Sequence, residues 1–252
     1  MPLIALISDL HSNIEATQVV LEDIQKNKVD EVFCLGDVIG YGPNPRETIQ
    51  LVKQFRVSLC GNHEEAVLFH AEDFNPKARR AIDWTREQLN GSQFDKEENY
   101  VMWDYLGDLQ EKHYEGDVLY VHASPNIPTR EYLLPKDAAD EIKMRSNFEK
   151  VDRAAFCGHT HIPGVFIEGE PFKYARELNN EYLLQPNGRK QIINIGSVGQ
   201  PRDGDNRVSY VLFDGEKVIW RRLPYDFKKT MAKILKIKDL AEYLALRLEQ
   251  GK

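Results

Sequence analysis

One feature constrains this chain more than any other: five apolar segments of strand length each end on aspartate, asparagine or histidine. The segments read LIALIS (3–8), EVFCL (31–35), FRVSLC (55–60), VLYV (118–121) and AAFC (154–157), and the polar residue follows directly or after one glycine. Residues 13–27 and 45–54, between the first three segments, have helical spacing, which predicts βαβ units and a parallel sheet. Because ligands bind at the carboxyl ends of parallel strands, we expect these polar residues to meet at one edge.

The residue types at these strand ends are those of a metal site. They include five of the seven histidines, and the full set is Asp9, His11, Asp37, Asn62, His63, His122, His159 and His161. Carboxylate, imidazole and amide oxygen suit Mn, Fe, Zn and similar divalent ions. These groups are too many for one ion and suit two ions that share a carboxylate. Asp37 follows a glycine in a tight turn and is the natural bridge.

The spacing within the motifs supports the same interpretation. Alternate residues of an extended segment point the same way, so Asp9 with His11, and His159 with His161, can reach one centre. Each motif alone is common, and an isolated histidine such as His122 is more often a hydrogen-bonded core residue. Five motifs in order, each at a strand end, are hard to produce by chance, so we predict a dinuclear metal centre.

The remaining segments indicate one domain, residues 1–252, in which a mixed sheet packs on a second sheet with helices outside. Residues 64–115 are charged and helical in pattern, and we expect a helical insert there. From 163 onward the pattern is β-rich, and we expect it to be antiparallel, with a hairpin turn at 214–217. Helices are expected at 136–148 and 227–249.

The overall charge limits the classes of binding partner that we expect. The formal net charge is −7, and an acidic chain is repelled by duplex nucleic acid and by anionic membranes. No apolar run approaches the roughly 20 residues of a membrane span, and the N-terminus lacks the basic region of a signal peptide. Three cysteines do not form a disulfide framework, and we expect them to fill strand ends as small buried hydrophobes. The expected location is the cytoplasm.

Taken in order, the motifs resemble those of a known superfamily. Asp9-x-His11, Gly36-Asp37, Gly61-Asn62-His63-Glu64, His122 and Gly158-His159-x-His161 look like the calcineurin-like metallophosphoesterases. The run Gly40-Tyr41-Gly42-Pro43 is similar to a small prokaryotic branch that is related to diadenosine tetraphosphatase-like phosphoesterases. Asn194-Ile195-Gly196-Ser197 also resembles a strand end of small members, with Ile195 where proline is usual. The resemblance implies a four-layer α/β/β/α sandwich.

The resemblance also implies roles for the site residues. One metal would be held by Asp9, His11, Asp37 and His161, and the second by Asp37, Asn62, His122 and His159. A hydroxide that bridges the two ions would attack phosphorus, with His63 beside the ions as the general acid. Glu64 is expected to support the site from outside or to start a helix. Manganese is the first choice of metal for assays, and Fe, Zn, Ni and Mg remain open.

Two departures from the family pattern bear on the substrate. Protein phosphatases of the superfamily carry an aspartate and an arginine where this chain has Gly40 and Tyr41. This favours a small phosphodiester, nucleotide or phosphomonoester as substrate. Arg130 and Arg202 are then candidates for phosphate binding, and Tyr41 is a candidate for stacking on a base. Each of these side chains also has a purely structural interpretation.

Two other functions stay open at this point. The first is a phosphoprotein phosphatase, and the second is a non-catalytic scaffold that binds metal or partners on the same fold. The presence of His63 argues against the scaffold. A homodimer is a further expectation, with Trp220 in the β-rich half as part of its edge.

Overall fold

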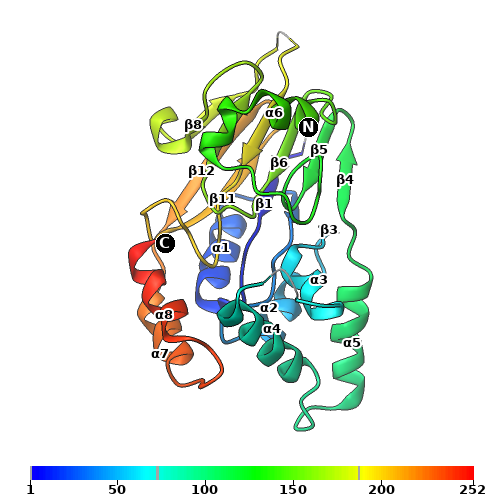
Figure 1. Cartoon of the computed structure of the whole chain (residues 1–252), viewed down its shortest axis with the longest axis vertical. Coiled ribbons are helices and arrows are strands. Elements are labelled where there is room, and N and C mark those ends of the chain that lie inside the picture. Colours follow the sequence, from blue (N-terminus) through cyan, green and yellow to red (C-terminus); the bar gives the residue numbers. More distant parts are fainter. Residues whose placement is uncertain (1, 72–73, 187) are drawn as a thin grey trace.

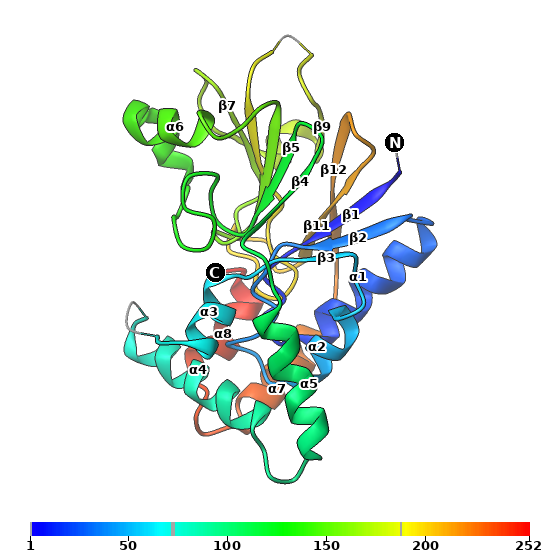
Figure 2. The ribbon, with the colours of Figure 1, turned by 90° about the vertical axis from the view of Figure 1, so that its right-hand side faces the viewer.

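The computed structural model describes residues 2–71, 74–186 and 188–252. Two six-stranded sheets pack against each other, and helices lie on their outer sides (Figure 1). This arrangement confirms the α/β/β/α sandwich expected from the resemblance. Turned by 90°, the molecule shows α6 beside one sheet and the other α-helices beside the second (Figure 2).

The first sheet contains the N-terminal strands. Its order is β3 (Val57–Ser58), β2 (Glu31–Cys34), β1 (Ile4–Ile7), β11 (Val208–Phe213), β12 (Lys217–Leu223) and β9 (Glu181–Leu183). The pairs β1–β2 and β2–β3 are parallel, as expected, whereas β11, β12 and β9 are antiparallel to their neighbours. The sheet is therefore mixed, and its parallel half carries three of the five motifs.

The second sheet contains the other two motifs. Its order is β4 (Lys112–Glu115), β5 (Val118–Val121), β6 (Ala154–Cys157), β10 (Gln191–Asn194), β7 (Gly164–Ile167) and β8 (Lys173–Tyr174). The expectation of an antiparallel second half is wrong at β10, which pairs parallel with β6 and antiparallel with β7. Local apolar pattern predicts a buried strand equally well in both directions, so only the chain path decides this.

Helices cover both outer faces. They are α1 (Ile14–Lys26), α2 (Pro45–Val52), α3 (Asn62–Leu68), α4 (Pro76–Leu89), α5 (Lys96–Gly107), α6 (Glu141–Phe148), α7 (Phe227–Ile234) and α8 (Glu242–Gln250). Two short 3₁₀ helices are η1 (Pro135–Ala139) and η2 (Ala175–Leu178). The segment 64–115, expected as a helical insert, contains most of α3, then α4, α5 and the edge strand β4.

A hydrophobic core lies between the two sheets. Ile4 and Leu6 of β1 point into this layer, whereas Ala5 and Ile7 point toward the helices, as the two-residue period of a strand requires. Both faces of β1 are buried, which is why the sequence reads as a continuous apolar run. Trp220 is only 2% exposed and lies in this inter-sheet core, so the expectation that it lines a dimer edge is wrong.

Two expected helices are broken in the structure. The predicted helix 136–148 is η1 followed by α6, because the Asp140 side chain accepts a hydrogen bond from Lys143 N and starts a new helix. The predicted helix 227–249 is α7 and α8, with a turn after Leu235. That turn lets Ile234 and Leu244 pack together against Trp84 of α4, a tertiary contact that the local pattern does not show.

Candidate metal centre

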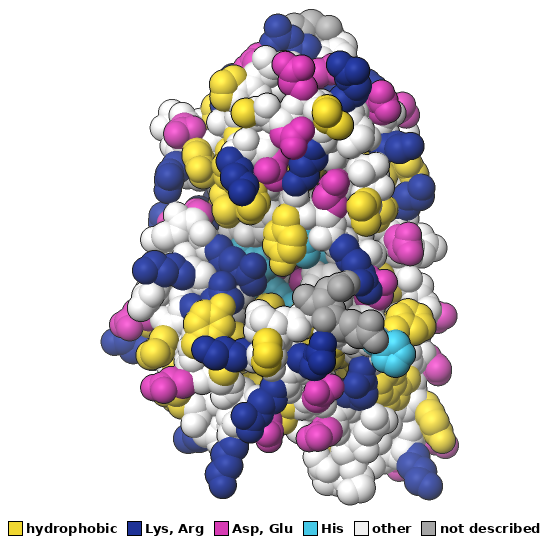
Figure 3. Space-filling model, viewed as in Figure 1, with side chains coloured by type: hydrophobic (Ala, Val, Ile, Leu, Met, Phe, Trp, Pro, Cys, Tyr) yellow, Lys and Arg dark blue, Asp and Glu magenta, His cyan; other side chains and the backbone are white. Residues whose placement is uncertain are grey.

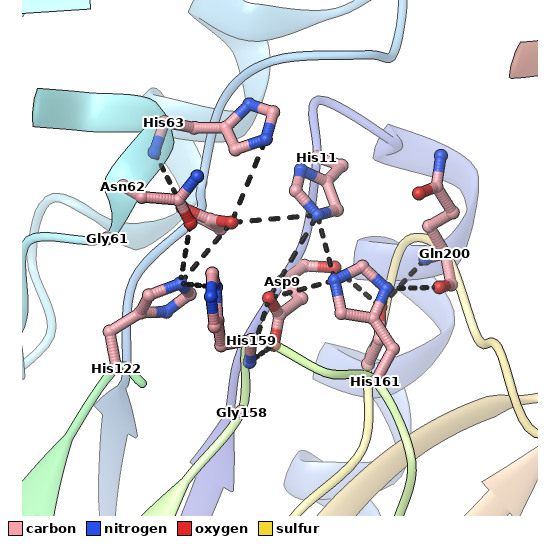
Figure 4. A network of polar contacts seen from close by, with 12 residues as sticks. Asp9, His11, Gly61, Asn62, His63, His122, Gly158, His159, His161 and Gln200 are labelled. Carbon is pink, nitrogen blue, oxygen red and sulfur yellow. Dashed lines mark hydrogen bonds and ion pairs between the residues drawn. The ribbon is translucent and has the colours of Figure 1, made fainter. Parts of the chain in front are cut away.

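The five strand-end loops meet at one place between the sheets. Loops after β1, β2, β5 and β6, together with the start of α3, bring the predicted residues into contact (Figure 4). Asp9, Asp37, His122 and His161 are almost fully buried, so the cluster is well shielded from solvent. The structure therefore brings the eight predicted residues to one centre from five separate segments.

Left-handed backbone conformations are concentrated in these loops. The φ angle is 55° at Asp9, 46° at His11, 51° at Asp37, 63° at His159 and 61° at His161. Such a conformation costs a non-glycine residue about 1–3 kcal/mol and persists where surrounding contacts impose it. The motif residues are therefore not extended, as the spacing argument assumed. Tight left-handed turns, rather than strand alternation, aim these side chains inward.

One half of the cluster is built around Asp9. His161 Nε2 lies 3.1 Å from Asp9 Oδ1, and His11 Nε2 lies 4.0 Å from the same oxygen. The two imidazole Nε2 atoms are 3.2 Å apart. Asp37 Oδ2 is 3.8 Å from His11 Nε2, so Asp37 reaches this half as well.

The other half is built around His122. Its Nε2 atom lies 3.2 Å from Asn62 Oδ1, 3.1 Å from His159 Nδ1 and 3.4 Å from Asp37 Oδ2. The same Asp37 oxygen thus faces both halves, which is the position that a bridging ligand requires. The spacing of His159 and His161 suggested one shared centre, but they face different halves of the cluster, in agreement with the two ligand sets implied by the resemblance.

The hydrogen bonds at the far side of the rings identify the inward-facing atoms as acceptors. Nδ1 of His11 and of His122 contacts the backbone oxygens of Ile39 and Leu35, at 3.3 Å and 2.9 Å. His161 Nδ1 likewise contacts Gln200 O. A carbonyl oxygen only accepts, so each Nδ1 carries the proton and each Nε2 presents a lone pair to the cluster.

Acceptors therefore face acceptors across the cluster centre. Imidazole lone pairs, the Asn62 amide oxygen and two carboxylates within hydrogen-bond distance repel each other unless a cation or a proton lies between them. Burial lowers the pKa of His122, but the Asp37 charge outweighs it and raises that pKa to about 9. These residues fit divalent metal ions in number, type and orientation, and the rings are oriented by bonds to backbone oxygens as metal ligands are.

Glu64 holds the bridging loop in place. Its Oε2 atom accepts hydrogen bonds from Asp37 N and Gly61 N at 2.8 Å each, and Oε1 accepts one from Ile39 N at 3.1 Å. Burial raises the pKa of Glu64, and the nearby Asp37 charge adds to this, to about 7. Glu64 thus joins the start of α3 to the Asp37 loop, in the supporting role that the sequence suggested.

The segment after β10 holds the other loops. Asn194 Nδ2 donates to Gly158 O at 2.6 Å and to Thr160 Oγ1 at 2.9 Å, which supports the loop that carries His159 and His161. Ser197 Oγ donates to Asp9 O at 2.9 Å. The resemblance drew attention to this segment, and its contacts support the loops that carry Asp9, His159 and His161.

His63 lies beside the cluster in an aromatic setting. Its backbone N–H donates to Asp37 Oδ1 at 2.9 Å, and its Nε2 atom is 4.0 Å from Asp37 Oδ2. The Tyr41 and Phe74 rings contact the His63 ring, with centroids 4.3 Å and 5.0 Å away. His63 Nδ1 is buried and has no hydrogen-bond partner, and burial lowers the pKa of the ring to about 4.

Gly40 explains why no carboxylate orients this ring. A Cβ atom at Gly40 would lie 2.0 Å from His63 Nδ1, and Gly40 has a φ of +86°. The ring therefore packs directly on the backbone of the glycine that replaces the aspartate of the protein phosphatases. The His63 ring is oriented instead by the Gly40 backbone and by two aromatic rings.

A pocket opens next to the cluster. It has a volume of about 330 Å³ and is lined by Tyr41, Asn62, Phe74, Asn75, Ala78, Arg130, Tyr132 and His159. Figure 3 shows histidine side chains at the bottom of a hollow, with lysine and arginine side chains at its border. An acidic chain thus presents positive charge where an anionic substrate would enter.

The predicted substrate residues lie near the centre in different settings. Arg130 borders the pocket, and its Nε atom donates to Glu65 Oε2 at 2.8 Å. Arg202 N donates to His161 O at 3.3 Å, which places this residue directly beside the ligands. Tyr41 packs its ring against both His11 and His63, so its role is packing as well as lining the pocket.

Sequence reasoning missed Tyr132 and Arg247. The Tyr132 ring lies 3.9 Å from the His159 ring, between centroids, and is 47% exposed at the pocket. Arg247 comes from α8 and is an electrostatic neighbour of Arg202, Tyr41 and Tyr132. An aromatic residue soon after a motif strand was a usable signal for Tyr132. No sequence signal pointed to Arg247, because the pattern of its segment predicts a helix on the exterior of the protein.

Comparison with known proteins agrees with this geometry. The sequence profile of the calcineurin-like phosphoesterase superfamily domain matches residues 3–217. An uncharacterized protein of Methanocaldococcus jannaschii is 39% identical over 99% of this chain and 98% of its own length. The crystal structure of a metallophosphoesterase from Sphaerobacter thermophilus is 36% identical, with a TM-score of 0.81 over 100% of this chain and 99% of that one. The chain belongs to the calcineurin-like phosphoesterase superfamily.

One relative has a named substrate. The symmetrical bis(5'-nucleosyl)-tetraphosphatase of Psychromonas ingrahamii is 25% identical over 161 residues, which are 61% of this chain and 56% of that protein. Membership of the superfamily implies a metal-dependent hydrolase of phosphoric esters. In the part of the chain that the structure describes, no helix has the length and apolar character needed to cross a membrane.

Proposed function

We propose that the protein hydrolyses a small phosphodiester, nucleotide or phosphomonoester with two divalent metal ions. One observation supports this proposal most directly. Hydrogen-bond acceptor atoms surround a single oxygen, Asp37 Oδ2, with His11 on one side and His122 on the other. The ligands would be Asp9, His11, Asp37 and His161 for one ion and Asp37, Asn62, His122 and His159 for the other. Mn²⁺ is the first metal to test, followed by Fe, Zn, Ni and Mg.

When bound, the two ions would supply a water of lowered pKa as nucleophile and a clamp for the phosphate oxygens. The chain's own residues position and shield this chemistry. The buried strand-end loops exclude bulk water, and Glu64 fixes the Asp37 loop through three backbone bonds. The pocket beside Asn62 and His159 would receive the leaving group of the ester.

His63 is the proposed general acid. Its ring lies beside Asp37 on the side that faces Tyr41, so a proton on this ring can reach an oxygen leaving the phosphorus. The pKa of about 4 belongs to the ring without substrate, where burial dominates. The negative charges of a phosphate ester beside the ring favour its protonated form.

A small substrate fits this site better than a folded phosphoprotein. The reactive residues are buried, and His63 is only 2% exposed. The partial relationship to a bis(5'-nucleosyl)-tetraphosphatase supports a nucleotide class of substrate. We do not propose duplex nucleic acid or membranes as partners, because the net charge of the chain is acidic. A cytoplasmic location and a homodimer remain expectations.

The test is metal-dependent ester hydrolysis by the whole protein. Metal-stripped protein would be assayed with bis(p-nitrophenyl) phosphate and p-nitrophenyl phosphate, with and without Mn²⁺. We expect turnover only with metal, and a fall of about 10²-fold or more in His63→Ala with metal binding retained. His70→Ala is the matched control, because His70 is exposed and follows the end of α3.

Two outcomes would contradict the proposal. Metal bound at two sites with no turnover of either ester would favour the scaffold function. A His63→Ala variant as active as the His70→Ala control would remove His63 from the chemistry.

A further inference from the structure

Arg202 and Arg247 come together because the loop after β10 contacts the end of α8. Gly204 N donates to Gly251 O at 3.0 Å, and Asn206 Nδ2 donates to Glu249 O at 3.2 Å. A Cβ atom at Gly251 would lie 2.8 Å from backbone atoms of Asp205, so the two segments touch closely. This contact places Arg247 of α8 beside Arg202 of the loop after β10.

The acidic residues of this loop are occupied elsewhere. Asp203 Oδ1 is 3.0 Å from Arg222 Nη2, and Asp205 pairs with both Arg207 and Arg222. Among the described residues, no aspartate or glutamate oxygen lies within 4.0 Å of the Arg202 or the Arg247 guanidinium. The loop thus neutralises two other arginines and leaves this pair without an aspartate or glutamate partner.

The remaining contacts of the pair leave one buried guanidinium donor without a partner. Arg202 Nη2 donates to Gln200 Oε1 at 2.8 Å, whereas Arg202 Nε is buried and has no hydrogen-bond partner. Arg247 Nε donates to the backbone oxygen of Lys252, and its guanidinium lies over the Tyr243 ring, 4.9 Å from the centroid. Neighbouring like charges with unused donors are unfavourable unless an anion satisfies them.

The position of the pair relates it to the metal cluster. Arg202 is next to His161 through its backbone, and its charge acts on His11, His63 and His161. Burial lowers the pKa of Arg247, and Arg202 beside it lowers the pKa further, to about 10. The pair therefore lies on the α8 side of the site, near Tyr41 and Tyr132.

We propose that Arg202 and Arg247 bind a second phosphate group of the substrate, adjacent to the phosphoryl group at the Asp/His cluster. The guanidinium forks suit phosphate oxygens and would satisfy the unused donors. The substrate class is then an ester or anhydride with at least two phosphoryl groups, such as a nucleoside diphosphate or a longer phosphate chain. This inference rests on the proposed function, because the cluster must hold the first phosphoryl group.

The experiment compares two ligands that differ by one phosphoryl group. Binding of AMP and of the non-hydrolysable α,β-methylene-ADP would be measured by calorimetry on the Mn²⁺-loaded full chain. We expect at least tenfold tighter binding of the methylene diphosphate, since hydrogen bonds to charged groups are each worth about 10-fold or more in affinity. Arg247→Gln should lose most of this preference and leave AMP binding unchanged.

Two further variants separate charge from folding. Arg247→Lys keeps the charge and should retain part of the preference for the methylene diphosphate. If the guanidinium had only a structural role, Arg247→Lys and Arg247→Gln would lose this preference equally. Arg145→Gln removes one positive charge from exposed α6, remote from the site, and should change nothing. Thermal melts would show that each variant is folded.

The outcomes distinguish this proposal from the proposed function. Equal binding of the two ligands to the wild type, or an unchanged preference in Arg247→Gln, overturns the second-phosphate subsite. Hydrolysis of p-nitrophenyl phosphate, which has one phosphate, is measured in parallel. Its absence would count against the hydrolase, and the calorimetric preference would still decide the subsite.

Discussion

The His63 ring is oriented by packing against carbon surfaces, and the backbone N–H of this residue is bonded to a carboxylate. Its N–H donates to Asp37 Oδ1, and its ring packs between Tyr41, Phe74 and the Gly40 backbone. Packing of this kind fixes the ring plane but leaves Nδ1 without a partner. Burial lowers the pKa of this ring and favours its neutral form, and an anionic substrate beside the ring would favour the protonated form.

Gly40 is the residue on which this orientation depends. In Gly40→Ala the new Cβ would meet His63 Nδ1 at 2.0 Å, so the ring must move. A displacement of about 1 Å in a catalytic group can reduce turnover about 10²-fold. We expect kcat for an aryl phosphate ester to fall by about that factor, while calorimetry shows Mn²⁺ binding retained.

The control for Gly40→Ala is Gly116→Ala. Gly116 has a φ of +60° and no atom within 4 Å of an added Cβ, so this variant has the backbone strain without the collision. It should lose about 1 kcal/mol of stability and no activity. Equal activity losses in the two variants would show that strain, and not His63, explains the effect.

At the scale of elements, the site depends on short connections between loops and helix starts. Glu64 in the first turn of α3 accepts backbone N–H groups from residues 37, 39 and 61. The loop after β10 supports the β1 and β6 loops through Ser197 and Asn194. The positions of the cluster residues are therefore set by contacts between elements, and each of these two supports holds two segments of the site.

Glu64→Gln tests this connection. A glutamine oxygen can replace Oε2, but its NH₂ group would face the Ile39 N–H, donor against donor. We expect a loss of about 1–3 kcal/mol in the free energy of unfolding, measured by urea denaturation. Mn²⁺ affinity should fall about 10–100-fold, as for other residues that support metal ligands.

Glu97→Gln serves as the comparison for Glu64→Gln. Glu97 is exposed near the start of α5, far from the ligand loops, so neither stability nor Mn²⁺ affinity should change measurably. If Glu64→Gln behaved like Glu97→Gln, the support of the Asp37 loop would have to come from other contacts.

Over the whole molecule, the two sheets are joined by a buried core and by a polar bond across it. Trp220 of β12 in the first sheet donates its Nε1–H to Asn194 O of β10 in the second, at 2.9 Å. The side chain of the same Asn194 supports the loop of His159 and His161. Sheet packing and ligand geometry are therefore coupled at this residue.

Trp220→Phe tests that coupling. It removes a buried donor and leaves a gap in the inter-sheet core, for which we expect a loss of about 2–4 kcal/mol in the free energy of unfolding. Trp103→Phe is the matched change on α5, where the indole is half-buried and bonds Asn90, and it should cost about 1 kcal/mol or less. Urea denaturation of both variants, followed by circular dichroism, makes the comparison. Similar losses would contradict the inter-sheet role.

The sequence by itself determined the layers of the fold and the residues that form the Asp/His cluster. Buried strands read as apolar runs because both of their faces are covered, and the polar residue that ends each run marks the edge where ligands collect. Asp9, Asp37 and His122 could therefore be named from local pattern, and the family resemblance sorted them into two groups. The features that could be predicted from the sequence are those that short stretches of residues determine.

The tertiary structure decided what depends on contacts between distant segments. It made β10 parallel to β6, divided the C-terminal helix in two, and directed the motif side chains inward through left-handed turns rather than by strand alternation. It also brought Arg247 to Arg202, which no local pattern indicated. The physical reason is that backbone turns and helix docking are selected by packing against residues far away in the chain, and a local window of sequence contains only one side of each such contact.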